Sequence, residues 1–506
     1  MIKRFQFFLM IFILFVYGLL ISQKINLVTA DLGRHLKNGE IFFKTFSIPQ
    51  TNFYSYTYPD FPFINHHWGS GAVFYLIHKI FGFAGLSVFF VLISLFTFWL
   101  FFDIARKRSR YSIAIVVSAI ALPVLVSRIE IRPEAFSYLF CGVFFWILWH
   151  IKNKLIAEKW LYLIPIIEFL WINLHIYFFL GFFLLGVFFL GSFIDKTDKK
   201  LAVSLIKVGI LSAILVLLNP AGIKGAIYPL QIFGNFGYTL FENQGVLFLS
   251  KIVKYVPSQY FIILFIILVV SWLASFIKKQ KISFENLIFT LFFSYLGWSA
   301  VRNFTLFGLF SIPIISANLS SLLKREEDEM ECFTGSSLVV VILFILFVLN
   351  PSYWSGSLSS TGFGLQNNNT KAAEFFLKEE IKGPVFNNYD SGGYLIYFLY
   401  PAQKVFVDNR PEAYPAKFFQ EVYIPVQEND IKWKELEGKE KFNSIFFYRH
   451  DLTPWGQNFL LNRVKDSSWA PVYVDDWSII FVKRNEENKE IIKRYELPKD
   501  MFLTSR

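Results

Sequence analysis

Long runs of apolar residues dominate residues 1–350 and alternate with shorter polar connections. Eleven runs are predicted as membrane helices, because their lengths approach the roughly 20 residues that cross a bilayer as an α-helix. They cover residues 5–21, 84–102, 111–127, 135–150, 160–174, 177–194, 202–218, 258–277, 284–300, 303–323 and 335–350. At Trp171-Ile-Asn-Leu-His175 the pattern is open: it predicts either two short helices meeting in a tight turn or one broken helix.

The polar connections carry basic residues in a regular alternation. The basic groups are Lys3-Arg4, Arg106-Lys107-Arg108 with Arg110, Lys152/Lys154/Lys159, Lys196/Lys199/Lys200, Lys278-Lys279-Lys281 and Lys324-Arg325. With eleven helices, all of them fall on one side, which the positive-inside rule identifies as the cytoplasm. We therefore predict a multi-pass plasma-membrane protein with a cytoplasmic N-terminus. Residues 1–21, which begin Met-Ile-Lys-Arg before the apolar run, also resemble a secretory signal. The cleavage-like Val28-Thr29-Ala30 lies too far beyond the run, which favours a retained anchor.

The same pattern predicts two domains. Residues 1–350 form a transmembrane domain whose first extracytoplasmic loop spans 22–83, with interfacial helices at 32–46 and 70–81. Residues 351–506 alternate short β-rich and helical pieces and are predicted to form an extracytoplasmic soluble α/β domain. Its predicted strands are 385–386, 405–407, 444–448, 472–474 and 479–482, and its predicted helices are 370–381, 415–427 and 456–465.

Composition agrees with the membrane class and narrows the function. The 506 residues are 55% hydrophobic and only 17% charged, whereas soluble domains contain about 25% charged residues. The net charge of +11 is explained by the basic connections, so nucleic-acid binding is not expected. Two cysteines exclude a disulfide framework. The soluble domain lacks the Gly-x-Gly-x-x-Gly pattern of a dinucleotide site.

Candidate catalytic residues follow the first apolar run: Asp31, His35, His66 and His67. Asp31 and His35 are four residues apart and share one face of a helix. They can act as an acid/base couple or, with His66 or His67, hold a divalent cation. The alternative interpretation is that Asp31 is a helix N-cap and His35 is simply exposed. The two roles of Asp31 are compatible.

Further charged residues lie in other predicted outer connections. Arg128-Ile-Glu130-Ile-Arg132 presents two guanidinium groups suited to phosphate oxygens, or a loop of mutually satisfied ion pairs. His175 is either a ligand or a hydrogen-bonded structural residue, and Arg302 either binds substrate or extends its charge to the interface. All are predicted on the same side as Asp31. Together they suit an anionic lipid-linked substrate, with Asp31 accepting a proton from the incoming hydroxyl and the arginines stabilising a phosphate leaving group.

The layout resembles the GT-C superfamily of membrane glycosyltransferases, which use polyprenyl-phosphate-linked sugars. In that family an acidic residue lies in the first outer loop, as Asp31 does here. The resemblance to a group of bacterial GT-C-like proteins spans nearly the whole chain. Its matching pieces are Asp31-x-x-x-His35 with Gly39-Glu40, Ile48-Pro49 before Asn52 to Thr57, His66-His67-Trp68, Trp171 to His175, Asn219-Pro220-Ala-Gly222, Arg302-Asn303, Tyr389-Asp390-Ser-Gly392-Gly393 and Val405 to Arg410.

The resemblance implies a GT-C-like helical fold and a hexosyltransferase-like enzyme that transfers sugar from a polyprenyl-phosphate donor to a cell-surface glycan, lipid or protein. Tyr389-Asp390-Ser-Gly-Gly is similar to the acceptor-reading segment of oligosaccharyltransferases, although a glycine-rich turn before a helix also explains it. The first loop has no clear Asp-x-Asp pair, so a divalent cation is left open. The alternatives are a transporter or flippase for a lipid-linked glycan, which would place its charges at the midplane, and a non-catalytic scaffold.

Overall fold

The computed structural model describes residues 2–194, 199–231, 234–320 and 328–502, arranged in two compact units. Unit 1 comprises Met1–Lys24, Ser87–Ala226 and Leu240–Phe363. Unit 2 comprises Ile25–Leu86, Ile227–Thr239 and Gly364–Arg506. This division by contacts differs from the composition-based domains, because it groups most of the first outer loop with the C-terminal region.

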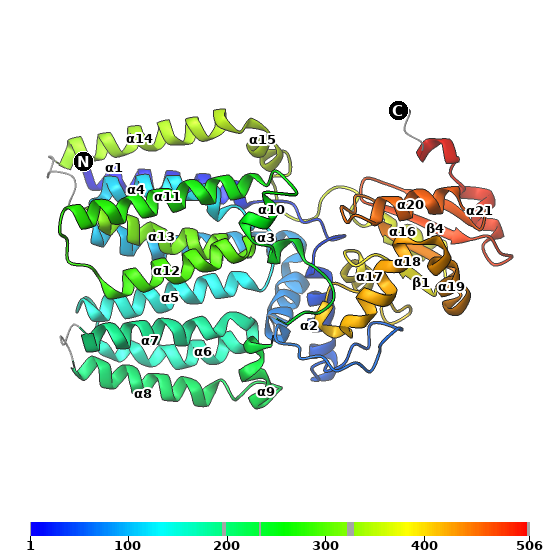
Figure 1. Cartoon of the computed structure of the whole chain (residues 1–506), viewed down its shortest axis with the longest axis horizontal. Coiled ribbons are helices and arrows are strands. Elements are labelled where there is room, and N and C mark those ends of the chain that lie inside the picture. Colours follow the sequence, from blue (N-terminus) through cyan, green and yellow to red (C-terminus); the bar gives the residue numbers. More distant parts are fainter. Residues whose placement is uncertain (1, 195–198, 232–233, 321–327, 503–506) are drawn as a thin grey trace. The chain divides into compact units, whose positions relative to one another are not determined.

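Unit 1 is a bundle of helices (Figure 1), and each predicted apolar run lies on a helix in the described part of the chain. These helices are α1 (Ile2–Ile21), α3 (Trp68–Arg108), α4 (Tyr111–Leu125), α5 (Glu134–Lys152), α6 (Leu163–Leu174), α7 (Phe179–Ile194), α8 (Lys199–Leu215), α11 (Val256–Ile277), α12 (Phe284–Ser299), α13 (Phe304–Leu319) and α14 (Asp328–Leu349). Shorter elements are η1 (Glu158–Tyr162), η2 (Ile176–Phe178), α9 (Gly222–Ile227), η4 (Phe241–Asn243), α10 (Val246–Leu249), η5 (Val301–Asn303) and α15 (Pro351–Ser359). The open question around His175 is resolved in favour of two helices, α6 and α7.

Length and apolar composition identify fewer membrane spans than the sequence pattern does. Among the described residues, five helices are long and apolar enough to cross a membrane: α1, α3, α5, the η2–α7 segment and α11. A sixth is obtained if α14 and α15, bent by 94°, count as one broken span. A multi-pass membrane protein is therefore supported, while the number of eleven spans and the orientation of the termini stay predictions.

Aromatic packing explains the abundance of phenylalanine in unit 1. Phe145 of α5, Phe289 and Phe293 of α12 and Phe310 of α13 are all at most 1% exposed. The rings of Phe293 and Phe310 stack with centroids 3.8 Å apart, and Phe145 lies 5.3 Å from Phe289. Aromatic pairs in such arrangements add packing energy beyond simple burial, so these contacts hold three helices together.

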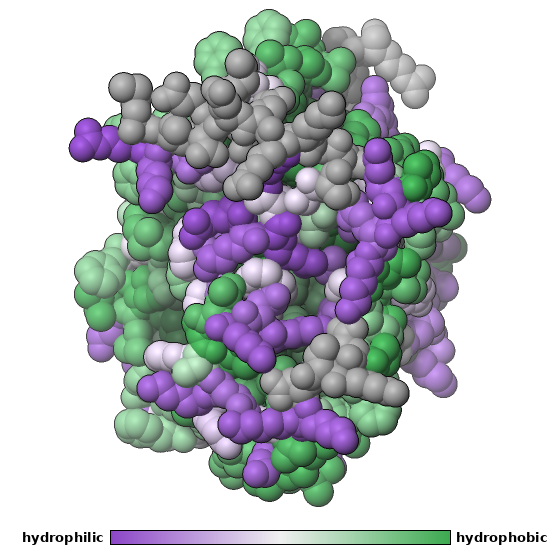
Figure 2. Space-filling model, turned by 90° about the vertical axis from the view of Figure 1, so that its left-hand side faces the viewer, coloured by the Kyte–Doolittle hydropathy of each residue, from purple (hydrophilic) through white to green (hydrophobic). Residues whose placement is uncertain are grey.

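The basic connections gather at one end of the unit 1 bundle. Lys107, Arg108, Lys152 and Lys281, which come from three connections, line a common pocket there. The face of the bundle at that end is rich in hydrophilic residues bordered by hydrophobic ones (Figure 2). If every second connection is basic, as the sequence predicts, the basic connections must lie at the same end of the bundle. Lys196, Lys324 and Arg325 lie outside the described residues.

The C-terminal part of unit 2 is α/β, as predicted. Its sheet has the order β1-β2-β4-β3, with β1 and β2 parallel and the other neighbours antiparallel. The strands are β1 (Val385–Asn387), β2 (Ser444–Tyr448), β3 (Trp469–Val474) and β4 (Ser478–Lys483). The helices are α16 (Lys371–Lys378), α17 (Gly392–Leu399), η6 (Pro411–Ala413), η7 (Phe418–Tyr423), α18 (Ile424–Glu428), α19 (Asp430–Glu440), α20 (Gly456–Lys465), α21 (Lys489–Tyr495) and η8 (Lys499–Phe502), and η3 (Tyr228–Leu230) comes from the middle of the chain.

The predicted strand at 405–407 is wrong, because its backbone pairs outside the sheet. Val405 exchanges backbone hydrogen bonds of 3.1 Å with Tyr54 and Tyr56 of the first outer loop. On its other side, the Asn387 side chain accepts from the Phe406 N–H at 2.9 Å and donates to the Val407 carbonyl at 2.8 Å. An apolar run shows that a segment is buried, but not which neighbour satisfies its backbone groups.

Helix α2 (Leu32–Thr45) is held by two close backbone approaches in unit 2. A Cβ atom on Gly33 would lie 2.6 Å from the Gly393 carbonyl oxygen of α17, and one on Gly39 would lie 2.2 Å from the Gly71 carbonyl oxygen of α3. Helix α3 is broken at Gly82, whose φ of 65° favours glycine. The helices predicted at 32–46 and 70–81 are thus present, and α2 carries the first candidate residue at its start.

Candidate functional site

Asp31 occupies the N-cap position of α2, as one of the two interpretations expects. Its side chain makes no capping hydrogen bond to the helix. Instead, its Oδ1 accepts a hydrogen bond of 2.5 Å from Nδ2 of Asn409, which lies 378 residues away in the sequence. The carboxylate is therefore directed towards the loop that follows residues 405–407.

Asn409 is in turn fixed by a buried cation. Arg34, only 4% exposed, donates from Nε to Oδ1 of Asn409 at 3.2 Å. This contact assigns the amide orientation, because Oδ1 can only accept and Nδ2 can only donate. Arg34 and Asp31 thus belong to one hydrogen-bonded chain that runs through a single side-chain amide. The arrangement fixes the position of Asp31 more firmly than an N-cap alone would.

A buried ion pair flanks Asn409 on both sides in the sequence. Arg410 is 1% exposed and donates to both carboxylate oxygens of Asp408, at 2.7 Å from Nε and 2.6 Å from Nη2. Nη2 also donates to Asn52 at 2.6 Å, and the guanidinium lies 4.7 Å from the Phe63 ring centroid. Both Asn52 and Phe63 come from the first outer loop. The pair therefore attaches that loop to the Asn409 segment.

Three histidines of the prediction lie together near α2. The rings of His35 and His67 are 5.6 Å apart, and those of His66 and His67 are 3.9 Å apart. His66 also lies 5.2 Å from the ring of Tyr228. His35 is 1% exposed, so the expectation of an exposed histidine does not apply. Within the described residues, no group of three or more His, Cys, Asp or Glu side chains is arranged to hold a metal ion.

Three carboxylates act electrostatically on one buried phenol in unit 2. Burial raises the pKa of Tyr389 well above its ordinary value, and the negative charges of Glu412, Asp31 and Asp390 add to that effect. Burial also raises the pKa of Glu412, against the opposing influence of Arg34. The structure therefore brings Asp390 and Asp31, predicted separately, into the surroundings of one side chain. A carboxyl group with a raised pKa in such surroundings is suited to proton transfer.

The arginines of unit 1 form a second charged cluster around Glu242. Arg128 and Arg132 each donate to Oε2 of Glu242 at 2.9 Å. Arg128 also pairs with Glu134 at 2.7 Å, and Arg132 with Glu130 at 2.6 Å. Burial disfavours the charged form of Glu242, but the arginines outweigh it and hold its pKa well below the ordinary value. For Arg128 and Arg132 this geometry supports the interpretation of a loop of ion pairs, in which Nη2 of Arg128 is the one buried guanidinium nitrogen of the two residues without a hydrogen-bond partner among the described residues.

Arg302 is held less tightly than the other two arginines. Its shortest carboxylate contacts are 3.8 Å, to Glu134 and Glu242, and its Nη1 donates to Asn243 at 3.0 Å. The guanidinium carbon lies 5.6 Å from the centroid of the Tyr177 ring. Its buried Nε has no hydrogen-bond partner among the described residues. Of the three arginines, Arg302 retains the most capacity to bind an anion.

His175 has the environment of a structural residue. It is 2% exposed, and its Nδ1 lies 2.7 Å from the Ser137 hydroxyl and accepts from the Tyr177 N–H at 3.4 Å. The Ser137 oxygen itself accepts from Trp171 Nε1 at 2.7 Å. Because His175 caps η2 through this network, these contacts belong to the turn between α6 and α7.

Comparison with known proteins identifies the fold. No protein-family model matches the chain, and no curated protein matches it in sequence. The oligosaccharyltransferase of Archaeoglobus fulgidus tethered to an acceptor peptide superimposes with a TM-score of 0.59 over 96% of this chain and 74% of its own, at 10% identity. The same archaeal enzyme, AglB, in complex with an inhibitory peptide and a dolichol-phosphate gives 0.55 at 12% identity, over 93% and 73%. The chain has the GT-C fold.

A more distant neighbour extends the comparison of GT-C structures. The mycobacterial arabinofuranosyltransferase AftD gives a TM-score of 0.51 at 11% identity, over 94% of this chain and 40% of its own length. At such identities the likeness shows the fold alone. It confirms the fold that the resemblance in the first outer loop and the apolar pattern implied.

Sequence reasoning missed the residues that hold the candidate groups of this GT-C chain in place. Asn409 and Arg410 lie in a motif that was noted, but nothing in it indicates contact with Asp31 or Asn52. Arg34 and Glu242 were not singled out. Arg34 had one available signal, since a cation three residues after a candidate acid within a predicted helix lies on nearly the same face.

Proposed function

We propose that this chain is a membrane glycosyltransferase of the GT-C type, which transfers sugar from a polyprenyl-phosphate-linked donor to an extracytoplasmic acceptor. The observation that carries the proposal is the position of Asp31. A carboxylate in the first outer loop accepts a hydrogen bond of 2.5 Å from Asn409, whose side-chain oxygen in turn accepts from the buried Arg34. The GT-C fold supports the class of reaction.

In this proposal Asp31 accepts the proton of the acceptor hydroxyl as the new glycosidic bond forms. Asn409 positions the carboxylate, since a fixed base within reach of the reacting group is what general-base catalysis requires. Asp390 is proposed to contact the acceptor, and His35, His66 and His67 to shape the surroundings of Asp31 or hold a divalent cation. The bond between the sugar carbon and the donor phosphate breaks, and the polyprenyl phosphate leaves as an anion.

Stabilisation of the leaving phosphate is assigned to unit 1. Arg302 is the proposed contact because its carboxylate partners are 3.8 Å away and its Nε is buried without a partner among the described residues. Arg128 and Arg132 are proposed to balance the negative charges of Glu242 and Glu130. His175 is proposed to maintain the turn between α6 and α7. A preorganised guanidinium aimed at a developing phosphate charge lowers the barrier of the step.

Complementation of a deletion strain tests the proposal. Deleting the gene should remove a surface glycan, and wild type should restore it. Asp31→Asn should fail to restore it while the protein accumulates normally in the membrane. Asp60→Asn is the matched control, because Asp60 is an exposed carboxylate in a turn of the same loop. Full restoration by Asp31→Asn would remove Asp31 from catalysis, and a build-up of untransferred donor outside the cell would separate a transferase from a flippase.

A further inference from the structure

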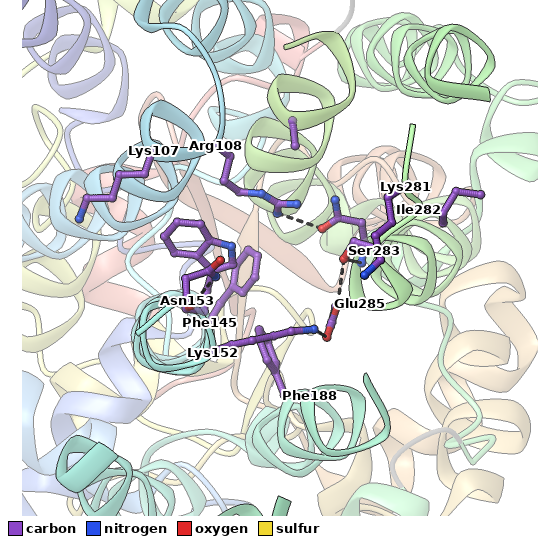
Figure 3. A pocket seen from close by; sticks show the side chains of 13 residues that line it. Lys107, Arg108, Phe145, Lys152, Asn153, Phe188, Lys281, Ile282, Ser283 and Glu285 are labelled. Carbon is purple, nitrogen blue, oxygen red and sulfur yellow. Dashed lines mark hydrogen bonds and ion pairs between the residues drawn. The ribbon is translucent and has the colours of Figure 1, made fainter. Parts of the chain in front are cut away.

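A cavity of about 430 Å³ opens at the basic end of the unit 1 bundle. Its lining residues come from the ends of α3 and α13, from α5 and α7, from the start of α12 and from the connection between α11 and α12. Pockets that bind small molecules have volumes of roughly 300–1,000 Å³. In Figure 3, Arg108 and Lys152 point towards the side of the pocket that carries Ser283 and Glu285, whereas Lys107 extends away from it. The cavity is therefore large enough to hold a ligand head group.

Positive charge predominates in the lining. Four cationic side chains, Lys107, Arg108, Lys152 and Lys281, line the cavity together with a single carboxylate, Glu285. Glu285 is already engaged by the Lys152 ammonium and by the Ser283 hydroxyl, which donates at 2.8 Å. Lys107 pairs with Asp103 at 2.8 Å. An anion entering this space would meet an excess of donors.

Arg108 forms no ion pair among the described residues, and Glu285 acts on its charge only from a longer distance. Its Nη1 donates to the neutral amide of Asn286 at 2.9 Å. In the described ranges it has no carboxylate within 4.0 Å. The side chain is half-buried, so the amide contact holds the guanidinium in the wall of the cavity rather than leaving it to move in solvent. A planar guanidinium fixed in this way presents paired N–H groups that match phosphate oxygens.

The remaining walls fit an amphiphile. Phe145, Trp149 and Phe188 supply apolar surface beside the polar rim of Asn153 and Asn286. The cavity also lies where α3 and α5, two of the helices long enough to span a membrane, end at Arg108 and Lys152. A spanning helix ends near the level of the lipid head groups, and basic pockets between membrane helices at that level bind anionic head groups.

We propose that this cavity is a binding site for a phosphate-bearing anion, distinct from the residues around Asp31. The inference does not depend on the proposed transferase activity, because it uses only the charge, burial and position of residues in unit 1. The phosphate comes either from a membrane lipid or from a soluble phosphate, and the two sources share the same contacts with Arg108 and Lys281.

Thermal unfolding of the full chain in a neutral detergent tests the site. Phosphatidic acid should raise the unfolding temperature relative to phosphatidylcholine, and inorganic phosphate serves as the soluble probe. An effect of phosphatidic acid alone assigns the site to lipid, and an equal effect of millimolar inorganic phosphate assigns it to soluble phosphate. Arg108→Gln should weaken binding by about tenfold or more, as expected for a lost charge-assisted contact.

Two further variants distinguish a built site from general attraction. Arg106→Gln is the matched control, because Arg106 is a neighbouring arginine paired with Asp103 and is not in the lining. Lys281→Gln, on an exposed connection, provides a second test if Arg108→Gln unfolds. Loss of binding in Arg108→Gln or Lys281→Gln but not in Arg106→Gln supports the site. Equal loss in all three variants, or no stabilisation of wild type by either probe, would overturn it.

Discussion

Removal of the Arg410 guanidinium is the most informative perturbation of unit 2. The Asp408–Arg410 pair is at most 1% exposed, and Arg410 also donates to Asn52 at 2.6 Å. Arg410→Met keeps much of the side-chain length but leaves the Asp408 carboxylate buried without its cation. The Tyr414 hydroxyl, which donates to Asp408 at 3.2 Å, is a poor substitute for a bidentate ion pair.

The expected cost follows from this geometry. Removing one partner of a buried pair costs about 3–5 kcal/mol, because the remaining charge has lost its compensation. Asp408→Asn, which removes the charge but keeps the shape, should cost less than Arg410→Met. The double variant should be less destabilised than the sum of the two, with a coupling of about 2 kcal/mol or more between contacting residues.

Amide hydrogen exchange in β2 of the detergent-solubilised full chain measures this cost within unit 2. A loss of about 3–5 kcal/mol corresponds to exchange faster by roughly two to more than three orders of magnitude, at 1.36 kcal/mol for each factor of ten. Arg449→Met is the control, because Arg449 is exposed and its side chain donates only to the Asp475 carbonyl among described partners. Additive effects of Asp408→Asn and Arg410→Met, within about 0.5 kcal/mol, would refute the reasoning.

Three further predictions concern the same unit. Asn409→Asp places a second carboxylate against Asp31, so the two carboxylates should share a proton. The acid limb of a pH–activity profile should then move to higher pH, and an unshifted profile would contradict this. Burial raises the pKa of Glu412, so the folded protein binds that proton more tightly than the unfolded chain and loses stability as the pH rises through the folded pKa. Glu412→Gln should therefore raise the unfolding temperature near pH 8 and change it little near pH 4. An equal shift at both pH values would contradict the burial argument. Gly39→Ala forces a methyl group to 2.2 Å from the Gly71 carbonyl, and should destabilise unit 2 by about 1–3 kcal/mol in the same exchange measurement; an unchanged rate would show that α2 moves freely.

The helical part of the fold was predictable because its signal is local. A run such as residues 258–277 is apolar on all sides, and α11 covers Val256–Ile277 with little change at either end. Helix α19 escaped prediction for the opposite reason. In Asp430–Glu440 only Trp433 is buried, so the segment has no apolar stripe and its stability comes from its cap at Asn429 and from packing of one ring.

The candidate site was predictable only in part, because its defining contacts join distant segments. Asp31 was found from its place after the first apolar run. Its partner Asn409 is 378 residues away, and no periodicity connects two positions across such a distance. The strand predicted at 405–407 failed for a related reason: the pattern shows burial, whereas the backbone partners Tyr54 and Tyr56 lie in another segment. Local patterns therefore identify a candidate acid but not the groups that orient it.

Charge counted along the sequence also overstates the cations available to a substrate. Arg128 and Arg132 look like two phosphate ligands when only their own loop is considered. Glu242, more than 100 residues later, accepts from both of them at 2.9 Å. These ion pairs must be broken or shared before either arginine binds an anion. The carboxylates nearest to Arg302 are farther away, at 3.8 Å. The same reasoning singles out Arg108 in its cavity, because its guanidinium is held by the neutral amide of Asn286 and not by an ion pair with a carboxylate.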